Sequence, residues 1–240
     1  MKTSRSTLRA GILAAGRGER LRRDPSELKA LVQVAGETLI ERVLRSMMEA
    51  DASDVTVIIN EDSRAIRDHV AGRDWPFAIH WIVETTPSSM HSFLRLVETL
   101  ASDGGDGPFL LSTVDTVAGP GAYADFFETA RTEEAAITLA LTSPGDDEKP
   151  LLVRTATGNS RVEAFGDGDY ATAGVYAVRP IVLREAEEAR RDGIDALRKF
   201  LARLLERGYP IAGIPIARSI DVDRPADIEA AEIFLREAQG

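Results

Sequence analysis

A glycine- and arginine-rich segment near the N-terminus carries residue types that are well suited to binding phosphate. The segment Leu13–Leu21 reads LAAGRGERL, and Lys29 follows it. Gly16 and Gly18 allow the backbone to approach a ligand closely and to turn N–H groups toward phosphate oxygens. Guanidinium groups bind phosphate oxygens in a bidentate manner. Four arginines lie within seven residues of an otherwise acidic chain: Arg17, Arg20, Arg22 and Arg23.

The spacing of these glycines separates the loop from two common phosphate-binding motifs. It does not match G-x-G-x-x-G, and it lacks the Gly-Lys-Ser/Thr ending of a P-loop. A glycine-rich turn with exposed arginines after a first strand also occurs in α/β proteins without a ligand there. The loop alone therefore leaves a purely structural turn open.

Three aspartates are candidates for holding a divalent cation. Asp115 follows the apolar run Phe109–Ser112, and an acid at the end of a buried strand is costly unless it is paired or bound to a metal. Asp221 and Asp223 are two residues apart, so they point to the same side of an extended segment. Mg²⁺ is commonly held by one or two carboxylates together with water and substrate oxygens. A helix cap remains the alternative for Asp115, and Asp227 is assigned to the first turn of the last helix.

The elements that must position these residues alternate between strands and helices in the first half of the chain. Apolar or β-branched runs predict strands at Leu8–Ala14, Asp54–Ile59, Phe77–Val83 and Phe109–Ser112. Helical spacing of apolar residues predicts helices at Leu39–Ala50, Asp62–Ala71 and Met90–Leu100. Such alternation predicts a largely parallel sheet with helices on both faces, and ligands of such sheets bind at the carboxyl ends of the strands.

The second half is less regular but is also predicted to alternate. Strands are expected at Ala135–Leu141, Leu151–Arg154, Arg161–Phe165, Thr172–Val178 and Tyr209–Ile216. Helices are expected at Pro180–Arg190, Ile194–Arg207 and Pro225–Ala238. Because no linker, repeat or low-complexity tract interrupts the pattern, residues 1–240 are predicted to form a single domain.

Composition excludes several classes of protein. The net charge of −10 argues against a nucleic-acid surface, which needs a basic stripe. The absence of cysteine excludes disulfides, thiolate zinc sites and cysteine nucleophiles. The apolar stretch Ala10–Ala15 is too short for a signal peptide, and no stretch approaches the ~18 apolar residues of a membrane helix. A cytoplasmic protein with no membrane partner is therefore expected.

The glycine–arginine loop and its continuation resemble the sugar-phosphate nucleotidyltransferase family. Leu13–Leu21, Lys29 and the segment Val34–Arg42 (VAGETLIER) carry the likeness. The family usually has proline where this chain has Leu28 and Thr38, and neither difference removes a charge. The run from Lys29 to Val34 (KALVQV) also resembles the phosphocholine and inositol-phosphate cytidylyltransferases. The segment Ser219–Ile228 also resembles the family's second acidic segment, so the likeness is strong at both ends of the chain and weak across residues 120–210, where the acceptor is expected to bind.

The resemblance implies a fold, a cofactor and a set of site residues. It implies a Rossmann-like, doubly wound, mostly parallel sheet of the nucleotide-diphospho-sugar transferase (glycosyltransferase-A-like) type, with Mg²⁺ as cofactor. Arg20 and Lys29 would contact the NTP phosphates, and Asp115 with Asp221 or Asp223 would hold the metal. The nucleotide is expected to contact Leu13, Ala14, Ala15, Gly16, Arg17, Gly18 and Ser89, and the acceptor Lys149 and Gly174.

Ser89 and Lys149 each have an ordinary structural alternative. Ser89 lies in a polar loop that resembles the family's base-binding loop, and it is equally suited to capping the helix that follows. Lys149 follows three acids and would also be at home in a solvated charged loop. Gly174 lies in Thr172–Tyr176, which resembles the family's small-residue strand beside the sugar ring, where glycine would permit close approach.

The function that follows from the resemblance is transfer of a nucleoside monophosphate from an NTP to a small phosphorylated acceptor, foremost a sugar 1-phosphate, with release of pyrophosphate. This would place the chain in sugar nucleotide biosynthesis. Cytidylyl transfer to phosphocholine, inositol phosphate or a phosphonate is the alternative, and a non-catalytic nucleotide-binding domain is another.

Two further activities are disfavoured. The loop lacks the Gly-x-Asp-Lys ending typical of molybdopterin nucleotidylation, and the missing G-x-G-x-x-G argues against a Rossmann oxidoreductase. Because the sequence ends at Gly240 directly after its last expected helix, we expect no appended β-helix or acyltransferase domain. A homodimer is compatible with the sequence.

Overall fold

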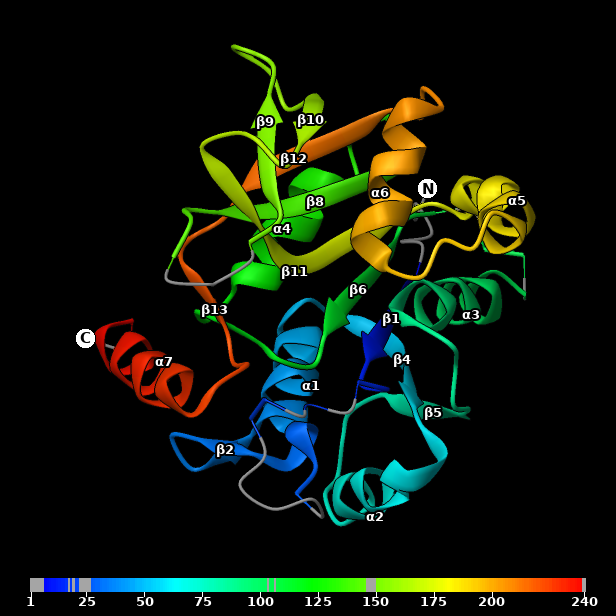
Figure 1. The fold of residues 1–240 in the computed structure, drawn as a ribbon. Coiled ribbons are helices and arrows are strands. Elements are labelled where there is room, and N and C mark those ends of the chain that lie inside the picture. The colour runs from blue at the N-terminus through cyan, green and yellow to red at the C-terminus, as the bar shows by residue number, and fades with distance from the viewer. Residues whose placement is uncertain are drawn as a thin grey trace, which may run out of the picture.

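A computed structural model shows a mixed α/β fold built on a nine-stranded sheet (Figure 1). The structure describes residues 7–16, 18, 20–21, 27–102, 104–105, 107–145 and 150–238. The sheet has the strand order β10-β9-β11-β6-β1-β4-β5, and β8 and β12 join it through β11.

The first half of the chain forms the parallel part of the sheet. Its strands are β1 (Leu8–Leu13), β4 (Ala52–Ile59), β5 (Ala78–Val83) and β6 (Phe109–Thr113), and every pairing among them is parallel. All four were predicted from their apolar runs. Their carboxyl ends therefore meet at one edge of the sheet, as the alternating pattern requires.

The second half of the chain adds antiparallel pairings to this parallel sheet. Its strands are β8 (Ile137–Thr142), β9 (Leu152–Thr155), β10 (Val162–Phe165), β11 (Tyr170–Val178) and β12 (Ile211–Pro215). The long strand β11 pairs antiparallel with β6, β8 and β9, whereas β12 pairs parallel with β8. The five strands were predicted, but their mixed orientation was not.

Helices cover both faces of the sheet. On one face α3 (Ser89–Ala101), α5 (Ala186–Arg191) and α6 (Leu197–Glu206) bury a core with Phe93 and Phe200. On the other face α1 (Leu39–Glu49), α2 (Arg64–Ala71) and α4 (Ala122–Ala130) bury a second core. Short 3₁₀ helices lie at Lys29–Leu31 (η1), Glu61–Ser63 (η2) and Pro180–Glu185 (η3). Among the described residues, no helix is long and apolar enough to cross a bilayer.

Helix α4 was not predicted from the sequence. Its buried face carries only two large side chains, Tyr123 and Phe126, beside two alanines, which is a weak periodic signal. The hydroxyl of Tyr123 lies 2.6 Å from that of Ser112, so a buried hydrogen bond ties α4 to β6. Tertiary packing rather than helical pattern therefore defines this element.

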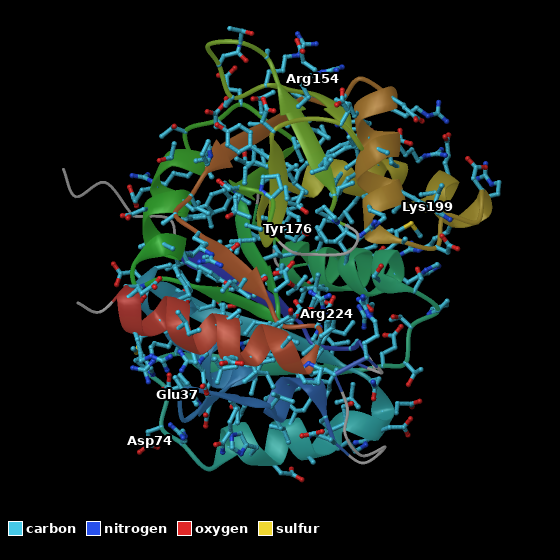
Figure 2. The ribbon with its side chains drawn as sticks, turned by 60° about the vertical axis from the view of Figure 1, so that its left-hand side comes forward. Glu37, Asp74, Arg154, Tyr176, Lys199 and Arg224 are labelled. Atoms are coloured by element: carbon cyan, nitrogen blue, oxygen red, sulfur yellow. The ribbon has the colours of Figure 1, made fainter. Side chains whose placement is uncertain are left out.

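Two small ribbons and the last helix form a third cluster beside the main sheet. The hairpin pairs β2 (Gln33–Val34) with β3 (Glu37–Thr38), and a second ribbon pairs β7 (Thr116–Ala118) with β13 (Ser219–Asp221). Helix α7 (Pro225–Glu237) packs against both ribbons (Figure 2, with Glu37 on the hairpin and Arg224 at the start of α7). This arrangement brings the C-terminal acids to the N-terminal loop.

Candidate functional site

A cleft of about 830 Å³ opens at the carboxyl ends of the parallel strands. Its walls come from the loops after β1, β4, β5 and β6, and from the segment between β13 and α7. We call it the main cleft. Its lining residues are Leu13, Ala15, Gly16, Gly18, Arg20, Lys29, Asn60, Thr85, Thr86, Pro87, Ser88, Ser89, Ser92, Thr113, Val114, Asp115, Leu197 and Asp223.

Neighbouring strands hold the start of the glycine loop in place. The backbone N–H of Ala14 donates to the carbonyl of Ile58 at 2.9 Å, and the N–H of Val114 donates to the carbonyl of Leu13 at 3.1 Å. The side-chain amide of Asn60 donates to the carbonyl of Ala15 at 3.2 Å. The segment thus continues the sheet for two residues beyond β1 and enters the main cleft as a rigid edge. Ala14 itself is buried behind that edge.

The two glycines of the loop play different parts in the structure. Gly18 has φ +61°, and a β-carbon there would lie 2.5 Å from the Cβ of Lys29. A glycine is therefore required for the loop to fold back over the lysine. A β-carbon at Gly16 would meet no atom within 4 Å, so Gly16 leaves open space on the cleft side. Arg17 lies outside the described residues.

Lys29 occupies the centre of the charged groups in the main cleft. Its Nζ lies 2.5 Å from Asp115 Oδ2 and 2.5 Å from Asp223 Oδ1. The other oxygen of Asp223 accepts from Arg20 at 2.7 Å. The side chain of Lys29 is only 8% exposed, whereas that of Arg20 is 57% exposed. The structure therefore brings together four of the predicted site residues, from three distant parts of the chain.

The charges of these groups depend on one another. Burial favours the neutral form of Lys29, but the nearby Asp115 and Asp223 have the larger combined effect and raise the pKa of Lys29. Burial likewise favours the neutral form of Asp115, but the effect of Lys29 is larger and lowers the pKa of Asp115. The pairing of Lys29 with Asp115 therefore favours the charged form of both groups.

Asp221 has a different environment from Asp223. Its Oδ1 accepts a hydrogen bond from the Thr116 hydroxyl at 3.2 Å, and burial together with the negative charge of Asp115 raises the pKa of Asp221 to about 7. Asp221 is absent from the residues that line the main cleft. The intervening Val222 is fully buried in the third cluster.

Asp227 fixes the turn that presents Asp223. Its Oδ2 accepts from the backbone N–H groups of Asp223 at 3.0 Å and Arg224 at 2.8 Å. Helix α7 begins at Pro225, which confirms the sequence assignment of Asp227 to the first helical turn. The backbone N–H of Val222 also donates to the Asp115 carbonyl at 2.9 Å. These bonds join the two acidic segments through the main chain.

A polar wall of the main cleft follows β5. The Thr86 and Ser92 hydroxyls are 2.5 Å apart, and Ser88 Oγ lies 2.9 Å from His91 Nδ1. Ser89 is the first residue of α3, and its hydroxyl accepts from the backbone N–H of Leu197 at 3.0 Å. Ser89 therefore lies at the cleft, as expected of a nucleotide contact, while its side chain also anchors the start of α6.

The two predicted acceptor residues are less informative. Gly174 has φ +70° and lies against Thr113 and Thr116, because a β-carbon there would come within 2.7 Å of the Thr113 hydroxyl. It does not line the main cleft. The contact with Thr113 and Thr116 inside the protein requires glycine at this position. Lys149 lies outside the described residues.

Sequence reasoning missed Asn60 and Leu197 as lining residues. The first of these could have been found by the rule that located Asp115, since Asn60 directly follows a parallel strand. Leu197 could not, because it lies at the start of a helix from the weakly patterned second half.

The carboxylates fit a magnesium ion by one geometric test. Asp115 Oδ2 and Asp223 Oδ1 are each 2.5 Å from the same ammonium nitrogen, so they lie at most twice that distance apart. Two ligands about 2.1 Å from a shared Mg²⁺ lie at most about 4.2 Å apart, a separation that falls within this limit, and water and substrate oxygens would fill the other positions. The described part of the chain contains no group of three or more acidic or imidazole side chains that forms a ready metal cage. A site with two carboxylates is therefore the arrangement to consider.

Comparisons with curated proteins give partial relatives. The chain is 38% identical over 104 residues to the bifunctional protein GlmU of Rhodopseudomonas palustris, covering 43% of this chain and 22% of that protein. It is 27% identical over 209 residues to a CMP-5′-(3-aminopropyl)phosphonate synthase of Streptomyces rubellomurinus, covering 84% of this chain and 32% of that protein. It is 27% identical over 239 residues to a bifunctional IPC transferase and DIPP synthase of Rubrobacter xylanophilus, covering 96% of this chain and 52% of that protein. The chain thus spans about half or less of the length of these relatives.

Solved structures share the fold at low sequence identity. The inositol-1-phosphate CTP transferase from T. maritima superposes with a TM-score of 0.77 at 20% identity, covering 95% of this chain and 94% of that one. A UDP-glucose pyrophosphorylase superposes with a TM-score of 0.79 at 14% identity, covering 97% and 100%. The family model described as the MobA-like NTP transferase domain matches residues 10–206, which contain the glycine loop, Lys29 and Asp115. This chain belongs to the MobA-like NTP transferase domain family.

Proposed function

We propose that this chain transfers a nucleoside monophosphate from an NTP to a small phosphorylated acceptor, with Mg²⁺ as cofactor and pyrophosphate as the second product. The observation that supports this most directly is the placement of Lys29 between Asp115 and Asp223 at the mouth of a glycine loop. Cation and carboxylates at one point suit a reaction whose substrates and leaving group are all polyanions.

In the proposed reaction, an oxygen of the acceptor phosphate attacks the α-phosphorus of the NTP. The bond from the α-phosphorus to the oxygen bridging it to the β-phosphate breaks, and the electron pair leaves with pyrophosphate. The attacking oxygen is already anionic, so no base is needed to activate it. The work of the protein is then to position two polyanions and to neutralise their charge.

The roles of the residues follow from their places in the main cleft. The rigid edge Leu13–Gly16 is placed to hold the base and sugar, and Gly18 brings backbone close to the phosphates. Arg20 is exposed at the cleft mouth and is free to turn from Asp223 toward the β- and γ-phosphates. Lys29 would exchange its bonds to the carboxylates for bonds to the same phosphates as pyrophosphate forms.

We assign the metal site to Asp115 and Asp223, with Asp221 supporting it through Thr116. Asp115 and Asp223 line the main cleft and already share one cation, Lys29, whereas Asp221 is withdrawn from the cleft. A Mg²⁺ ion bound there would supply charge neutralisation at the α-phosphate. This assignment depends on Lys29 moving when the nucleotide arrives.

A sugar 1-phosphate is the first acceptor to test, as the family likeness implies. Cytidylyl transfer to a polyol phosphate or a phosphonate is the second, and a specific observation favours it. The two curated relatives that match 84% and 96% of this chain are named as a CMP-phosphonate synthase and an IPC transferase. Both acceptors present the same phosphate or phosphonate oxygens to the α-phosphorus.

We further propose that residues 1–240 act as one catalytic domain in the cytoplasm, as a monomer or a homodimer. The two ends of the chain both contribute to the main cleft, which supports a single catalytic unit. No nucleic acid or membrane partner is proposed.

The test is pyrophosphate release in the presence of Mg²⁺. Four NTPs are crossed with sugar 1-phosphates, inositol phosphate, phosphocholine and phosphonates, and Asp115→Ala serves as the control. Release with one pair that is lost in the control supports the proposal and identifies the substrates. Binding of an NTP without turnover on any acceptor would favour a non-catalytic nucleotide-binding domain, and absence of NTP binding would overturn the proposal.

A further inference from the structure

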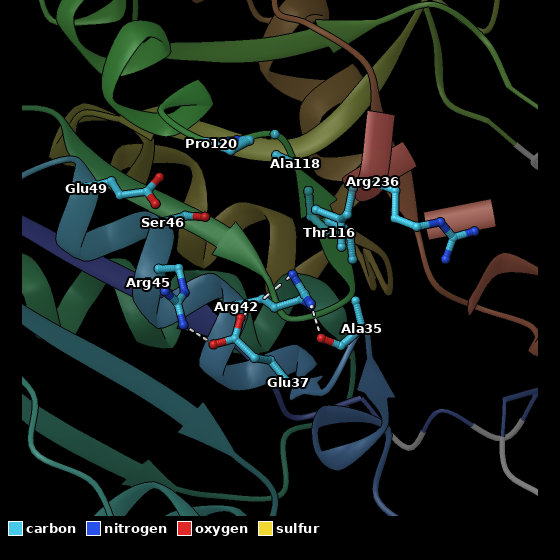
Figure 3. Close-up of a pocket in the computed structure, with 13 residues that line it drawn as sticks. Ala35, Glu37, Arg42, Arg45, Ser46, Glu49, Thr116, Ala118, Pro120 and Arg236 are labelled. Atoms are coloured by element: carbon cyan, nitrogen blue, oxygen red, sulfur yellow. Dashed lines mark hydrogen bonds and ion pairs between the residues drawn. The ribbon is translucent and has the colours of Figure 1, made fainter. Parts of the chain in front are cut away.

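A second pocket, separate from the main cleft, lies against β7 (Figure 3). It has a volume of about 350 Å³ and lies between α1, β7 and α7. We call it the rear pocket. Its lining residues are Ala35, Glu37, Arg42, Arg45, Ser46, Glu49, Thr116, Val117, Ala118, Gly119, Pro120, Leu235 and Arg236.

The rear pocket is basic in a chain that is acidic overall. Three arginines line it against two glutamates, whereas the chain has a net charge of −10. Arg45 pairs with Glu37, and Glu49 accepts from the backbone N–H of Gly121 at 2.9 Å. Both glutamates therefore have partners already, and the three arginines and two glutamates of the lining carry one net positive charge.

Arg42 is the fixed cation of the rear pocket. Its Nε donates to the carbonyl of Val34 at 2.8 Å, and its guanidinium also contacts the carbonyl of Ala35 at 3.4 Å (Figure 3). Its side chain is 15% exposed, and its nearest carboxylate oxygen, on Glu37, is 3.8 Å away. Burial lowers the pKa of Arg42, and the charge of Arg45 adds to this shift, whereas Glu37 and Glu232 oppose it. Because the nearest carboxylate oxygen is 3.8 Å away, an arriving anion could approach the guanidinium more closely than Glu37 does.

The remaining walls suit a ligand with a small apolar body. Val117, Ala118 and Pro120 line one side, and Leu235 lines another. Ser46 presents a hydroxyl from α1 between these walls and Arg45 (Figure 3). Arg236 borders the opening, and its guanidinium points outward (Figure 3). A volume of about 350 Å³ is at the lower end of the range for small-molecule pockets.

The floor of the rear pocket is also the back of the proposed metal site. Thr116 lines the pocket, and its hydroxyl lies 3.2 Å from Asp221 Oδ1 and 2.9 Å from the Thr113 hydroxyl. Asp115 directly precedes Thr116, and β7 pairs with β13, which ends at Asp221. A ligand that pressed on β7 would therefore reach both acidic segments through one ribbon.

We propose that the rear pocket is a second binding site for a small phosphate monoester, whose phosphate is held by Arg42 and Arg45 and whose body packs on β7. Occupancy of this site alters the main cleft through Thr116. The site is distinct from the proposed NTP site, since the residues that line the two pockets do not overlap.

The experiment measures binding by hydrogen exchange in the absence of Mg²⁺ and NTP. The probes are inorganic phosphate and the four nucleoside 5′-monophosphates at 10 mM, a concentration chosen to saturate sites of millimolar affinity. At least one probe is expected to protect backbone amides in residues 35–49 and 116–121. The double variant Arg45→Gln/Arg236→Gln is expected to weaken that protection at least tenfold in apparent Kd. Both side chains are exposed, so the variant should keep its fold.

Arg67→Gln is the matched control, because Arg67 is an exposed arginine on α2 outside both pockets. It should bind the probe as the parent does. Protection confined to the loops of the main cleft, or protection unchanged in the double variant, would overturn the proposal, as would no protection by any probe.

A second measurement tests the link between the two pockets. If the chain releases pyrophosphate, the bound probe should change the rate in the parent and in Arg67→Gln but not in the double variant. A rate that responds equally in all three would overturn the coupling. Because the binding measurement needs no turnover, failure of the proposed activity would leave it interpretable.

Discussion

Replacing Lys29 with methionine removes the cation between Asp115 and Asp223 while keeping a buried side chain of similar length. Three carboxylates then share a small volume with Arg20 as the nearest described cation, on an exposed side chain. The variant is expected to be less stable, because it leaves buried negative charge without its partner.

The size of the effect can be worked from the exposure of the partners. Removing one member of a buried ion pair typically costs about 3–5 kcal/mol. The side chains of Asp115 and Asp223 are 23% and 31% exposed, and Asp223 keeps its bond to Arg20, so solvent and Arg20 offset part of the loss. A loss of about 3 kcal/mol is therefore expected, or a fall of roughly 6–12 °C in Tm for a chain of this size.

The pH of the measurement matters. The pKa of Lys29 is raised from its ordinary value of 10.5, so its contribution is complete below that pH and is lost as the pH rises through the raised value. The pKa of Asp115 is lowered from 3.8, so its contribution is present above that pH and is lost as the pH falls through the lowered value. Urea unfolding at pH 8 with EDTA, followed by circular dichroism, lies inside this window.

The matched control is the double variant Lys29→Met/Asp115→Asn. If charge pairing is the cause, removing the carboxylate as well should restore part of the stability, with a coupling of about 1–3 kcal/mol between the two sites. A loss below about 1 kcal/mol for Lys29→Met, or a double variant whose loss equals the sum of the single variants, would refute the reasoning.

Three further predictions concern the surroundings of this cluster. Burial and the neighbouring carboxylate of Asp115 raise the pKa of Asp221 to about 7, so the charged form of Asp221 destabilises the metal-free fold. Asp221→Asn should therefore raise the free energy of unfolding by on the order of 2–4 kcal/mol at pH 8 and by little at pH 4, as measured by urea unfolding. An equal increase at the two pH values would contradict this explanation. Gly174→Ala should lower the free energy of unfolding by about 3 kcal/mol, as measured by thermal unfolding. The control is Gly158→Ala, at a position with a similar φ but open space around it, and its loss should be much smaller. Equal losses in the two variants would show that the close contact is unimportant. Asn60→Ala should raise the KM for NTP about tenfold with a smaller effect on kcat, since it frees the carbonyl of Ala15; an unchanged KM would exclude a positioning role.

Much of the fold was predictable because the first half of the chain repeats one simple pattern. Each strand there is a short apolar run, and each helix has one apolar face, so the parallel order and the edge that carries the loops follow from general rules. Asp115 was located as a candidate by that reasoning. Helix α4 and the antiparallel orientation of β11 were not predicted. Burial against distant elements defines α4, and the direction in which β11 pairs with β6 and β8 has no local sequence signal.

The geometry of the candidate site was less predictable than its membership. The loop and the acids were recognisable from residue type, but the shared contact of Lys29 with Asp115 and Asp223 joins residues 86 and 194 positions apart. The two-residue spacing predicted that Asp221 and Asp223 point to one side of an extended segment. It could not show that, of the two, Asp223 alone lines the main cleft. That difference arises from the tight turn at Asp227 and from the pairing of β13 with β7.

The contact between Lys29 and Asp223 also bears on how the protein is made. The strands that border the glycine loop, β1, β4 and β6, are complete by Thr113, so this part of the sheet can assemble before residues 219–237 are synthesised. Until β13 and α7 dock, Lys29 has Asp115 as its acidic partner and the rear pocket has no α7 wall. A nascent chain would thus form the glycine loop before Asp223 reaches Lys29. Docking of β13 and α7, rather than formation of the parallel sheet, is then the step that completes the carboxylate pair around Lys29.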